Sequence, residues 1–199
     1  MDKEINYIIK QHAEWIQSGG ADGKQIELNN MIFENKIIEN QDLSVAFFVE
    51  CKFIKCEFKN IDLSDAYFIG SCFEECSFLN CMMSKAEFSE TTLVGGEIRG
   101  CTGIKVNFYN SLLEAINIEQ SDLRSVNFTK TIISNCHIKK NDISNGIFKE
   151  TCIINTEFKE IEGIDECRVM SIYTDVERKI KIEREDIIEW LRHSTNQGK

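Results

Sequence analysis

The sequence places a large apolar residue at every fifth position from Leu28 to Phe158. Of the 27 such positions, 26 hold Leu, Ile, Phe or Met, with Gly103 as the exception. Twelve of the thirteen phenylalanines lie in this series, and the register contains no insertion. A period of five matches neither a helix of 3.6 residues per turn nor an alternating strand, so the chain must turn a corner in every repeat.

The position two residues before each large residue is mostly small, as at Ala66, Cys76 and Ser111. Residues i and i+2 of a strand share a face, so each repeat is expected to direct one small and one large side chain inward. The position two residues after the large one is Asn in nine of the 27 repeats and Gly in three. Both residue types tolerate positive φ, which predicts a corner at this position.

This pattern resembles the pentapeptide-repeat family, whose consensus is roughly Ala-(Asp/Asn)-Leu-x-x. Residues 86–90 (Ala-Glu-Phe-Ser-Glu) and 121–125 (Ser-Asp-Leu-Arg-Ser) fit the consensus well, whereas residues 41–45 begin with Gln. The resemblance covers residues 26–165 and implies a right-handed four-sided β-helix, an all-β solenoid with four repeats in each coil. About seven coils, stacked at about 4.8 Å, would form a column about 34 Å long.

A coil of four repeats predicts that residues four repeats apart in the chain stack in columns. The first column begins at Leu28, and the other three begin at Phe33, Ile38 and Leu43. The column from Leu43 contains Gly103, which leaves a gap in it. Like rings stack well on a common face, so the segregation of phenylalanine into one column supports the coil of four repeats. After Leu28, the first column holds only Phe48, Phe68, Phe88, Phe108, Phe128 and Phe148.

The N-terminal flank, residues 1–25, is expected to contain a capping helix and a linker. Apolar residues recur at helical spacing over Lys3–Gln17, Asp2 is a suitable capping residue, and residues 18–20 end the pattern with two glycines. A solenoid exposes apolar core at its end unless another element covers it. We therefore expect this helix to cap the first coil; a separate partner-binding helix is the alternative.

The C-terminal flank, residues 166–199, is expected to contain a short helix and a frayed tail. Acidic residues precede this helix and basic residues end it, which suits the helix dipole. The helix either caps the last coil or pairs with a second copy, and some members of the family dimerise through C-terminal helices. We expect a homodimer, because closed twofold pairing is the commonest assembly. The candidate dimer residues are Ile187, Ile188, Trp190 and Leu191.

The net charge of −10 and the pI near 4.9 argue against direct binding of nucleic acid, which requires a basic surface. The longest apolar run, residues 45–49, is far too short to span a membrane, and the first residues do not form a signal segment. We expect no membrane association and a cytoplasmic location, where the nine cysteines stay reduced.

The cysteines are expected to be structural, because most follow the repeat and none form the C-x-x-C pairs of a zinc site. Cys72, Cys152 and Cys167 lie outside the inward register and are the more plausible sites of oxidation. The six cysteines at the small inward position are Cys51, Cys56, Cys76, Cys81, Cys101 and Cys136.

No pattern in the sequence indicates catalysis. His12, His137 and His193 are not expected to converge, and the glycine-rich residues 95–100 lack the Lys-Ser/Thr of a phosphate-binding loop. Side chains should fill the coil and leave no internal ligand cavity. We expect no enzymatic activity, no metal and no cofactor.

Two functions remain. The first is a protein-interaction scaffold with an unknown partner, whose candidate surface is an outward cluster of Phe47, Val49, Tyr67 and Ile69. The second comes from the resemblance: some relatives bind DNA gyrase, a type II topoisomerase, as mimics of duplex DNA and protect it from quinolones or toxins. Residues 26–165 carry 22 acids and 13 bases. The resulting net charge is under half of the roughly 20 charges on duplex DNA of about 34 Å, which favours the scaffold.

Overall fold

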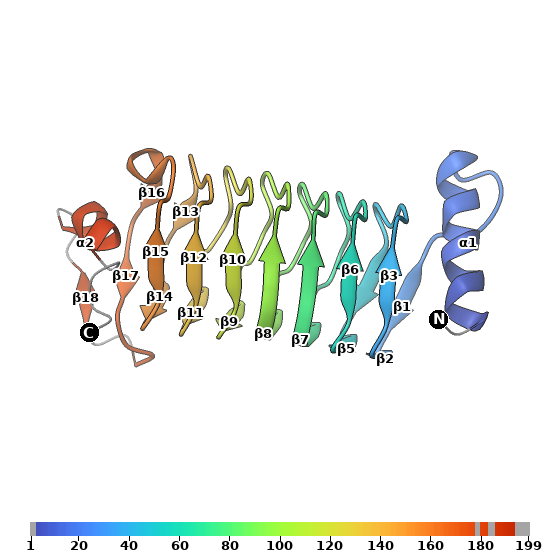
Figure 1. The fold of residues 1–199 in the computed structure, drawn as a ribbon, viewed down its shortest axis with the longest axis horizontal. Helices are drawn as coiled ribbons and strands as arrows, with labels where there is room; N and C mark the ends of the chain where they lie inside the picture. The colour runs from blue at the N-terminus through green and yellow to red at the C-terminus, as the bar shows by residue number, and fades with distance from the viewer. Residues whose placement is uncertain (1–2, 178–179, 183–185, 194–199) are drawn as a thin grey trace.

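The computed structural model describes residues 3–177, 180–182 and 186–193. The expected cap Asp2 and the tail from residue 194 lie outside these ranges. Short strands stack along one long axis, with α1 (Lys3–Gln17) at one end and α2 (Ile187–His193) at the other (Figure 1). The chain is therefore a solenoid with a helix at each end, and α1 has the limits expected from the sequence.

The strands are short because each occupies one side of a coil. In chain order they are β1 (Glu27–Asn29), β2 (Ile32–Glu34), β3 (Ile37–Glu39), β4 (Phe47–Val49), β5 (Lys52–Ile54), β6 (Glu57–Lys59), β7 (Cys72–Leu79), β8 (Thr92–Arg99), β9 (Leu112–Glu114), β10 (Asn117–Glu119), β11 (Ile132–Ser134), β12 (His137–Lys139), β13 (Ile147–Phe148), β14 (Thr151–Ile154), β15 (Glu157–Lys159), β16 (Arg168–Val169), β17 (Ile172–Tyr173) and β18 (Lys181–Ile182). A 3₁₀ helix, η1 (Ile164–Glu166), follows β15.

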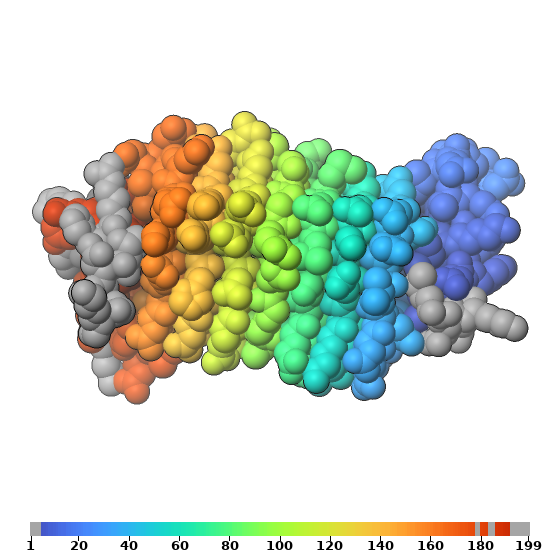
Figure 2. Space-filling model, in the orientation of Figure 1, coloured from blue at the N-terminus to red at the C-terminus, as the bar shows by residue number. Residues whose placement is uncertain are grey.

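Neighbouring coils pair in parallel, and each residue lies beside the one that follows four repeats later in the chain. Leu28 pairs with Phe48, Phe33 with Phe53, and Ile38 with Phe58. The fourth side is held by isolated bridges with the same offset, such as the one between Asp42 and Asp62. These pairings confirm a four-sided β-helix of about seven coils, which appear as consecutive bands in Figure 2.

Every predicted corner has positive φ. This holds at all 27 positions from Asn30 to Glu160. Three of them are Gly70, Gly95 and Gly100, and the others are not glycine and have φ between 45° and 62°. This conformation costs an ordinary L-residue about 1–2 kcal/mol, and Asn tolerates it best. Corner geometry therefore explains why Asn recurs there.

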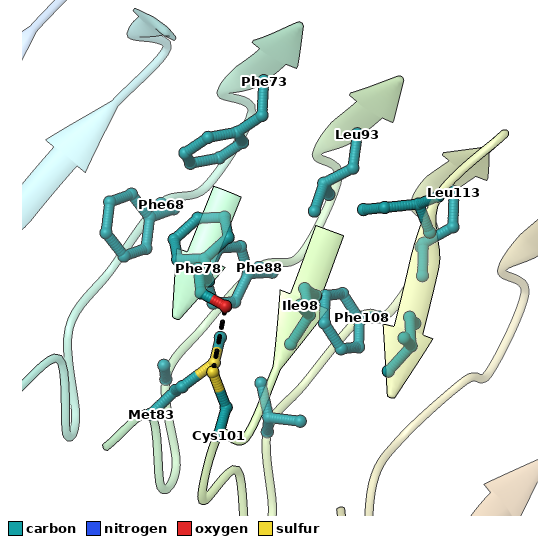
Figure 3. Close-up of a cluster of buried hydrophobic side chains, with 14 of the residues drawn as sticks. Phe68, Phe73, Phe78, Met83, Phe88, Leu93, Ile98, Cys101, Phe108 and Leu113 are labelled. Carbon is teal, nitrogen blue, oxygen red and sulfur yellow. Dashed lines mark hydrogen bonds between the residues drawn. The ribbon is translucent and has the colours of Figure 1, made fainter. Parts of the chain in front are cut away.

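The large residues form the predicted columns inside the coil (Figure 3). The rings of Phe53 and Phe73 stack with centroids 4.8 Å apart. Leu28 is only partly buried, whereas Phe33 and Ile38 of the same first coil are buried. Gly103 leaves little free space, because a Cβ there would lie 3.0 Å from Leu123 and 3.4 Å from Val106. Val106 replaces the alanine found at equivalent corners of earlier coils, so its extra methyl groups lie beside the missing side chain.

The coil changes register near its C-terminal end. Ile147 pairs with Arg168 and Thr151 with Ile172, so the partner lies one position beyond four complete repeats. The additional residue lies in the segment that contains η1, which begins after Gly163 at φ 70°. Parallel pairing thus continues beyond residue 165, but one residue out of step with the columns.

Candidate protein-interaction surface

Two stacked rings on the outside of the coil define the candidate surface. Phe47 and Tyr67 occupy equivalent positions in successive coils and are joined by a parallel bridge. Their ring centroids lie 4.5 Å apart with an angle of 2° between the planes. Val49 and Ile69 occupy the next outward positions of the same two coils, and Ile69 is 37% exposed. We call Phe47, Val49, Tyr67 and Ile69 the aromatic patch.

The aromatic patch lies on the side of the phenylalanine column. Phe48 lies between Phe47 and Val49 in β4 and is buried, so alternation of the strand turns its neighbours outward. Phe47, Val49 and Tyr67 are each half-buried. Because the two rings cover each other's faces, their edges form the part that solvent or a partner can contact.

A polar ladder continues the same row toward the C-terminus. Asn127 donates from Nδ2 to Oδ1 of Asn107 at 2.9 Å, and Asn107 donates from Nδ2 to Oε2 of Glu87 at 2.7 Å. Ser89 also donates to this Glu87 oxygen, at 3.0 Å. Tyr67 bridges to Glu87 through the backbone, so the ladder begins beside the aromatic patch. The row is therefore apolar at one end and carries fixed hydrogen-bonding groups at the other.

The candidate dimer residues divide into two pairs. Ile187 and Leu191 are buried and join the core of their own chain at the end of the last coil. Ile188 and Trp190 are half-buried, and Trp190 packs at the edge of that core. The helix α2 thus lies against the coil end, and of the four candidate residues Ile188 and Trp190 retain apolar surface for a second copy.

The inward cysteines are buried as expected, but Cys152 differs from its expectation. Cys152 is 1% exposed, and its thiol donates to the carbonyl of Asp175 at 3.1 Å. The segment after β17 covers Cys152, so the prediction that it is one of the more plausible sites of oxidation was wrong. Cys72 and Cys167 are half-buried. Burial raises the pKa of Cys136 to about 11 and that of Cys167 to about 12, which keeps both as unreactive thiols.

The inward small residues have a hydrogen-bonding role that the sequence analysis missed. Ser111 donates from Oγ to the carbonyl of Phe88 at 2.6 Å and accepts the backbone N–H of Thr91 at 3.1 Å. Cys101 donates to the carbonyl of Phe78 at 3.4 Å (Figure 3). The same bond, to the carbonyl 23 residues earlier, is made by Cys51, Cys56, Ser71, Cys76, Cys81, Thr131, Cys136, Asn141, Thr151 and Thr156.

On the fourth side of the coil, the residue types at the small inward position differ from those on the other sides, and this difference would have revealed the hydrogen-bonding role. There the backbone N–H at the small position closes a turn, as when Ala46 donates to Leu43 at 3.2 Å and Ala66 donates to Leu63 at 3.0 Å. These positions hold only Ala, Val or Gly from Ala46 to Gly146. A column of apolar small residues beside columns of Ser, Thr and Cys therefore marks which corners need a side-chain hydrogen bond.

The two histidines whose side chains the structure describes, His12 and His137, do not converge. His12 lies on the face of α1 that packs on the first coil and is buried, whereas His137 is exposed and lies 3.3 Å from Glu157. The side chain of His193 is outside the described part of the chain. Within residues 3–177, 180–182 and 186–193, no three His, Cys, Asp or Glu side chains are grouped as a metal site. None of the helices in these ranges is long and apolar enough to cross a bilayer.

One surface ion pair on the fourth side has strong geometry. Arg124 donates to both carboxylate oxygens of Asp122, from Nε at 2.8 Å and from the guanidinium NH2 group at 2.7 Å. These bonds lower the pKa of Asp122. Asp122 also accepts the backbone N–H of Arg124, so it serves the local turn as well as the ion pair. This arrangement stabilises a corner and presents no free reactive group.

The coils and the external patch define a β-solenoid that presents side chains on flat outer faces. A family profile described as pentapeptide repeat region matches residues 48–128. Residues 48–128 thus match the pentapeptide-repeat family, and coils of the same four-repeat length continue on both sides of them.

Several solved structures are similar to this chain. Full-length QnrB1, a plasmid-mediated fluoroquinolone resistance protein, is 15% identical, with 75% of this chain and 94% of that chain covered and a TM-score of 0.43. HetL, involved in heterocyst differentiation regulation in Nostoc sp. strain PCC 7120, is 10% identical, with 86% and 97% covered and a TM-score of 0.24. A pentapeptide repeat protein from the Arabidopsis thaliana thylakoid lumen is 22% identical, with 51% and 68% covered and a TM-score of 0.29. No curated protein sequence matches the chain.

Proposed function

We propose that this pentapeptide-repeat protein is a non-enzymatic interaction scaffold and that the aromatic patch is the surface that contacts its protein partner. The stacking of Phe47 on Tyr67 is the observation that carries the proposal. A corner-forming repeat needs no aromatic residue at its outward positions. Two equivalent outward positions nevertheless hold aromatic rings, beside the exposed Ile69.

The neighbourhood of the aromatic patch suits a protein interface. Interfaces combine a central apolar cluster with a polar rim, and aromatic residues dominate their binding energy. The stacked rings would form the centre, and the ladder that begins at Glu87 would form one side of the rim. The ladder is already ordered by its own hydrogen bonds, so a partner would not have to immobilise those side chains.

The charge of the coil favours this function over mimicry of DNA. Residues 26–100, which contain the aromatic patch, hold 13 acids against 6 bases. Several acids are already paired, such as Glu74 with Lys52 at 2.7 Å and Asp65 with Lys85 at 3.8 Å. A phosphate mimic needs unpaired negative charge in a continuous row, whereas Phe47 and Tyr67 interrupt one such row.

The test replaces the two rings without touching the core. In Phe47→Ser/Tyr67→Ser the fold should persist, because both side chains point outward. The control is Met82→Ser, which removes a 50% exposed side chain from another side of the coil. Tagged wild-type, double-variant and control proteins are used to capture partners from the native cell extract, with mass spectrometry as the readout.

We expect a specific partner to be captured by the wild type and the control and lost from the double variant. A partner retained equally by all three would reject the aromatic patch as the contact surface. The captured proteins are also examined for gyrase subunits, and the purified protein is added to a gyrase supercoiling assay. Protection of gyrase that survives in the double variant would replace the scaffold proposal with the DNA-mimic alternative.

A further inference from the structure

The helix α1 covers the N-terminal end of the solenoid unevenly. It is fixed on the β1 side, where His12 accepts the backbone N–H of Ile26. At the corner after β1, Met31 occupies the inward position that usually holds a small residue, yet its side chain is 43% exposed. The equivalent residue one coil later, Cys51, is 1% exposed. Leu28, just before this corner, is only partly buried. The corner from Leu28 to Ile32 thus lies outside the cover that α1 provides.

The strands beyond this corner form an open sheet edge. Among the residues that the structure describes, β2 pairs only with β5 and β3 only with β6, both on the side of the second coil. The outward side chains on these strands are Ile32, which is 64% exposed, and Ile37, which is 57% exposed, together with the exposed Glu34 and Glu39. Unpaired strand edges recruit further strands unless they are blocked by charge, proline or a covering element. Here each strand carries one exposed isoleucine and one exposed glutamate, so the edge repels acidic strands and favours a strand with basic residues.

The charge of the first coil indicates what can bind there. Residues 26–45 contain four acids and one base. Glu27, Glu34 and Glu39 lie on β1, β2 and β3, and all three are exposed. On the far side of β3, the protein itself places Lys59 opposite Glu39, while Glu57 lies opposite Ile37. A strand with basic residues at its outward positions would pair a base with Glu34 and Glu39 on the open side.

We propose that the open edge of β2 and β3, together with Met31, Ile32 and Ile37, binds an extended segment of a partner protein by strand addition. The segment carries Lys or Arg in alternation with apolar residues. Backbone hydrogen bonds to the edge supply affinity, and the alternating side chains supply specificity. A second copy of this chain fits poorly, because twofold pairing would bring the acids of both copies together. This surface is separate from the aromatic patch and does not depend on it.

The experiment uses the full chain and two short fluorescein-labelled peptides. In one peptide Val and Lys alternate, and in the other Glu replaces every Lys. Fluorescence anisotropy measures affinity, and hydrogen exchange with mass spectrometry measures protection of the backbone amides of residues 31–39. We expect the Lys peptide to bind at least about tenfold more tightly than the Glu peptide and to slow exchange in this segment.

Two variants separate the contributions of apolar contact and charge. Ile32→Ser/Ile37→Ser removes the exposed isoleucines without changing the charge, and Glu34→Lys/Glu39→Lys reverses the charge. Each should weaken binding of the Lys peptide about tenfold, whereas the control Met82→Ser should leave it unchanged. All substituted side chains are exposed, so thermal unfolding should show that the fold is retained.

Three results would overturn the proposal. The first is binding of the Lys peptide without protection of residues 31–39. The second is equal affinity in the wild type and in Ile32→Ser/Ile37→Ser. The third is a dimer in sedimentation that dissociates in Ile32→Ser/Ile37→Ser, since the edge would then be occupied by a second copy.

Discussion

The buried imidazole of His12 accepts the backbone N–H of Ile26 through Nδ1, at 3.1 Å. Because Nδ1 is the acceptor, the ring proton is on Nε2, which donates to the carbonyl of Ser44 at 3.0 Å. The ring also stacks on Trp15, with centroids 5.9 Å apart. One side chain therefore satisfies two backbone groups of the first coil and attaches α1 to it.

We expect acid to weaken this attachment, because a protonated ring would direct a second N–H at the amide of Ile26. Burial lowers the pKa of His12 from 6.5, while attraction to Asp42 and the bond to Ser44 act in the opposite direction. The unfolded chain therefore binds more protons just below the ordinary pKa. The contribution of His12 to stability is complete above about pH 6.5 and is lost as the pH falls toward the folded-state pKa.

Urea unfolding of the wild type and of His12→Gln at about pH 8 and about pH 5 measures this contribution. The variant should be less stable at the higher pH by about 1–3 kcal/mol, because a buried backbone group loses its partner. The gap between the two proteins should narrow at the lower pH. A gap that stays constant would show that His12 does not titrate in this range.

Val45 should be the least favourable of the corner residues. Its φ is 51°, a conformation that crowds a β-branched side chain, whereas nine equivalent corners hold Asn. Val45→Asn should raise the free energy of unfolding by about 1 kcal/mol. The matched change Asn40→Val should lower it by at least as much, since it also removes the contact between Asn40 and Asn60 at 3.3 Å. Denaturant unfolding measures both, and a destabilised Val45→Asn would contradict this account.

Gly96 should not tolerate any side chain. Its φ is 84°, and a Cβ built on it would lie 1.9 Å from the carbonyl oxygen of Cys76 in the preceding coil. The control is Gly19→Ala, because Gly19 also has positive φ, 64°, but nothing lies within 4 Å of its added Cβ. Gly96→Ala should destabilise the protein by about 1–3 kcal/mol more than Gly19→Ala in the same unfolding assay. Equal losses would show that only backbone strain matters at Gly96.

Dimerisation through α2 remains a prediction. Because Ile187 and Leu191 are buried in their own chain, the candidate contact residues are now Ile188 and Trp190. Ile188→Ser/Trp190→Ser should convert a dimer to a monomer in analytical ultracentrifugation, because two half-buried apolar side chains would no longer gain from being covered. The control Val176→Ser changes a 64% exposed side chain in the segment after β17. A double variant that remains dimeric would move the interface away from α2.

The columns and corners were predictable because one register governs local and distant contacts together. The period of five fixes which side chains point inward, and the coil of four repeats then fixes their neighbours, as in the pairing of Phe33 with Phe53. The limits of α1 were predictable because apolar spacing and the glycines after it agree. The outward positions of Phe47 and Tyr67 follow from the same register, which also places them in successive coils.

The remaining features depend on contacts that the register does not encode. From the sequence, His12 could be recognised only as one residue of an amphipathic helix. Its two backbone partners, Ile26 and Ser44, belong to the first and last repeats of the first coil. Cys152 was judged by its outward position, but a later segment folds over it. The hydrogen bonds of the inward cysteines were missed because Cys was treated as a hydrophobe, whereas the coil uses it in the same way as Ser and Thr.

The one-residue step before β16 limits where this solenoid can be lengthened. Duplication of any four consecutive repeats between Leu28 and Glu160 would insert a coil in phase with both neighbours. A coil added after η1 would inherit the longer offset, so its large side chains would fall between the existing columns. Coils added after the one-residue step would not be in register with the existing columns. Evolutionary growth of this protein by coil duplication is therefore confined to the part of the chain before the step.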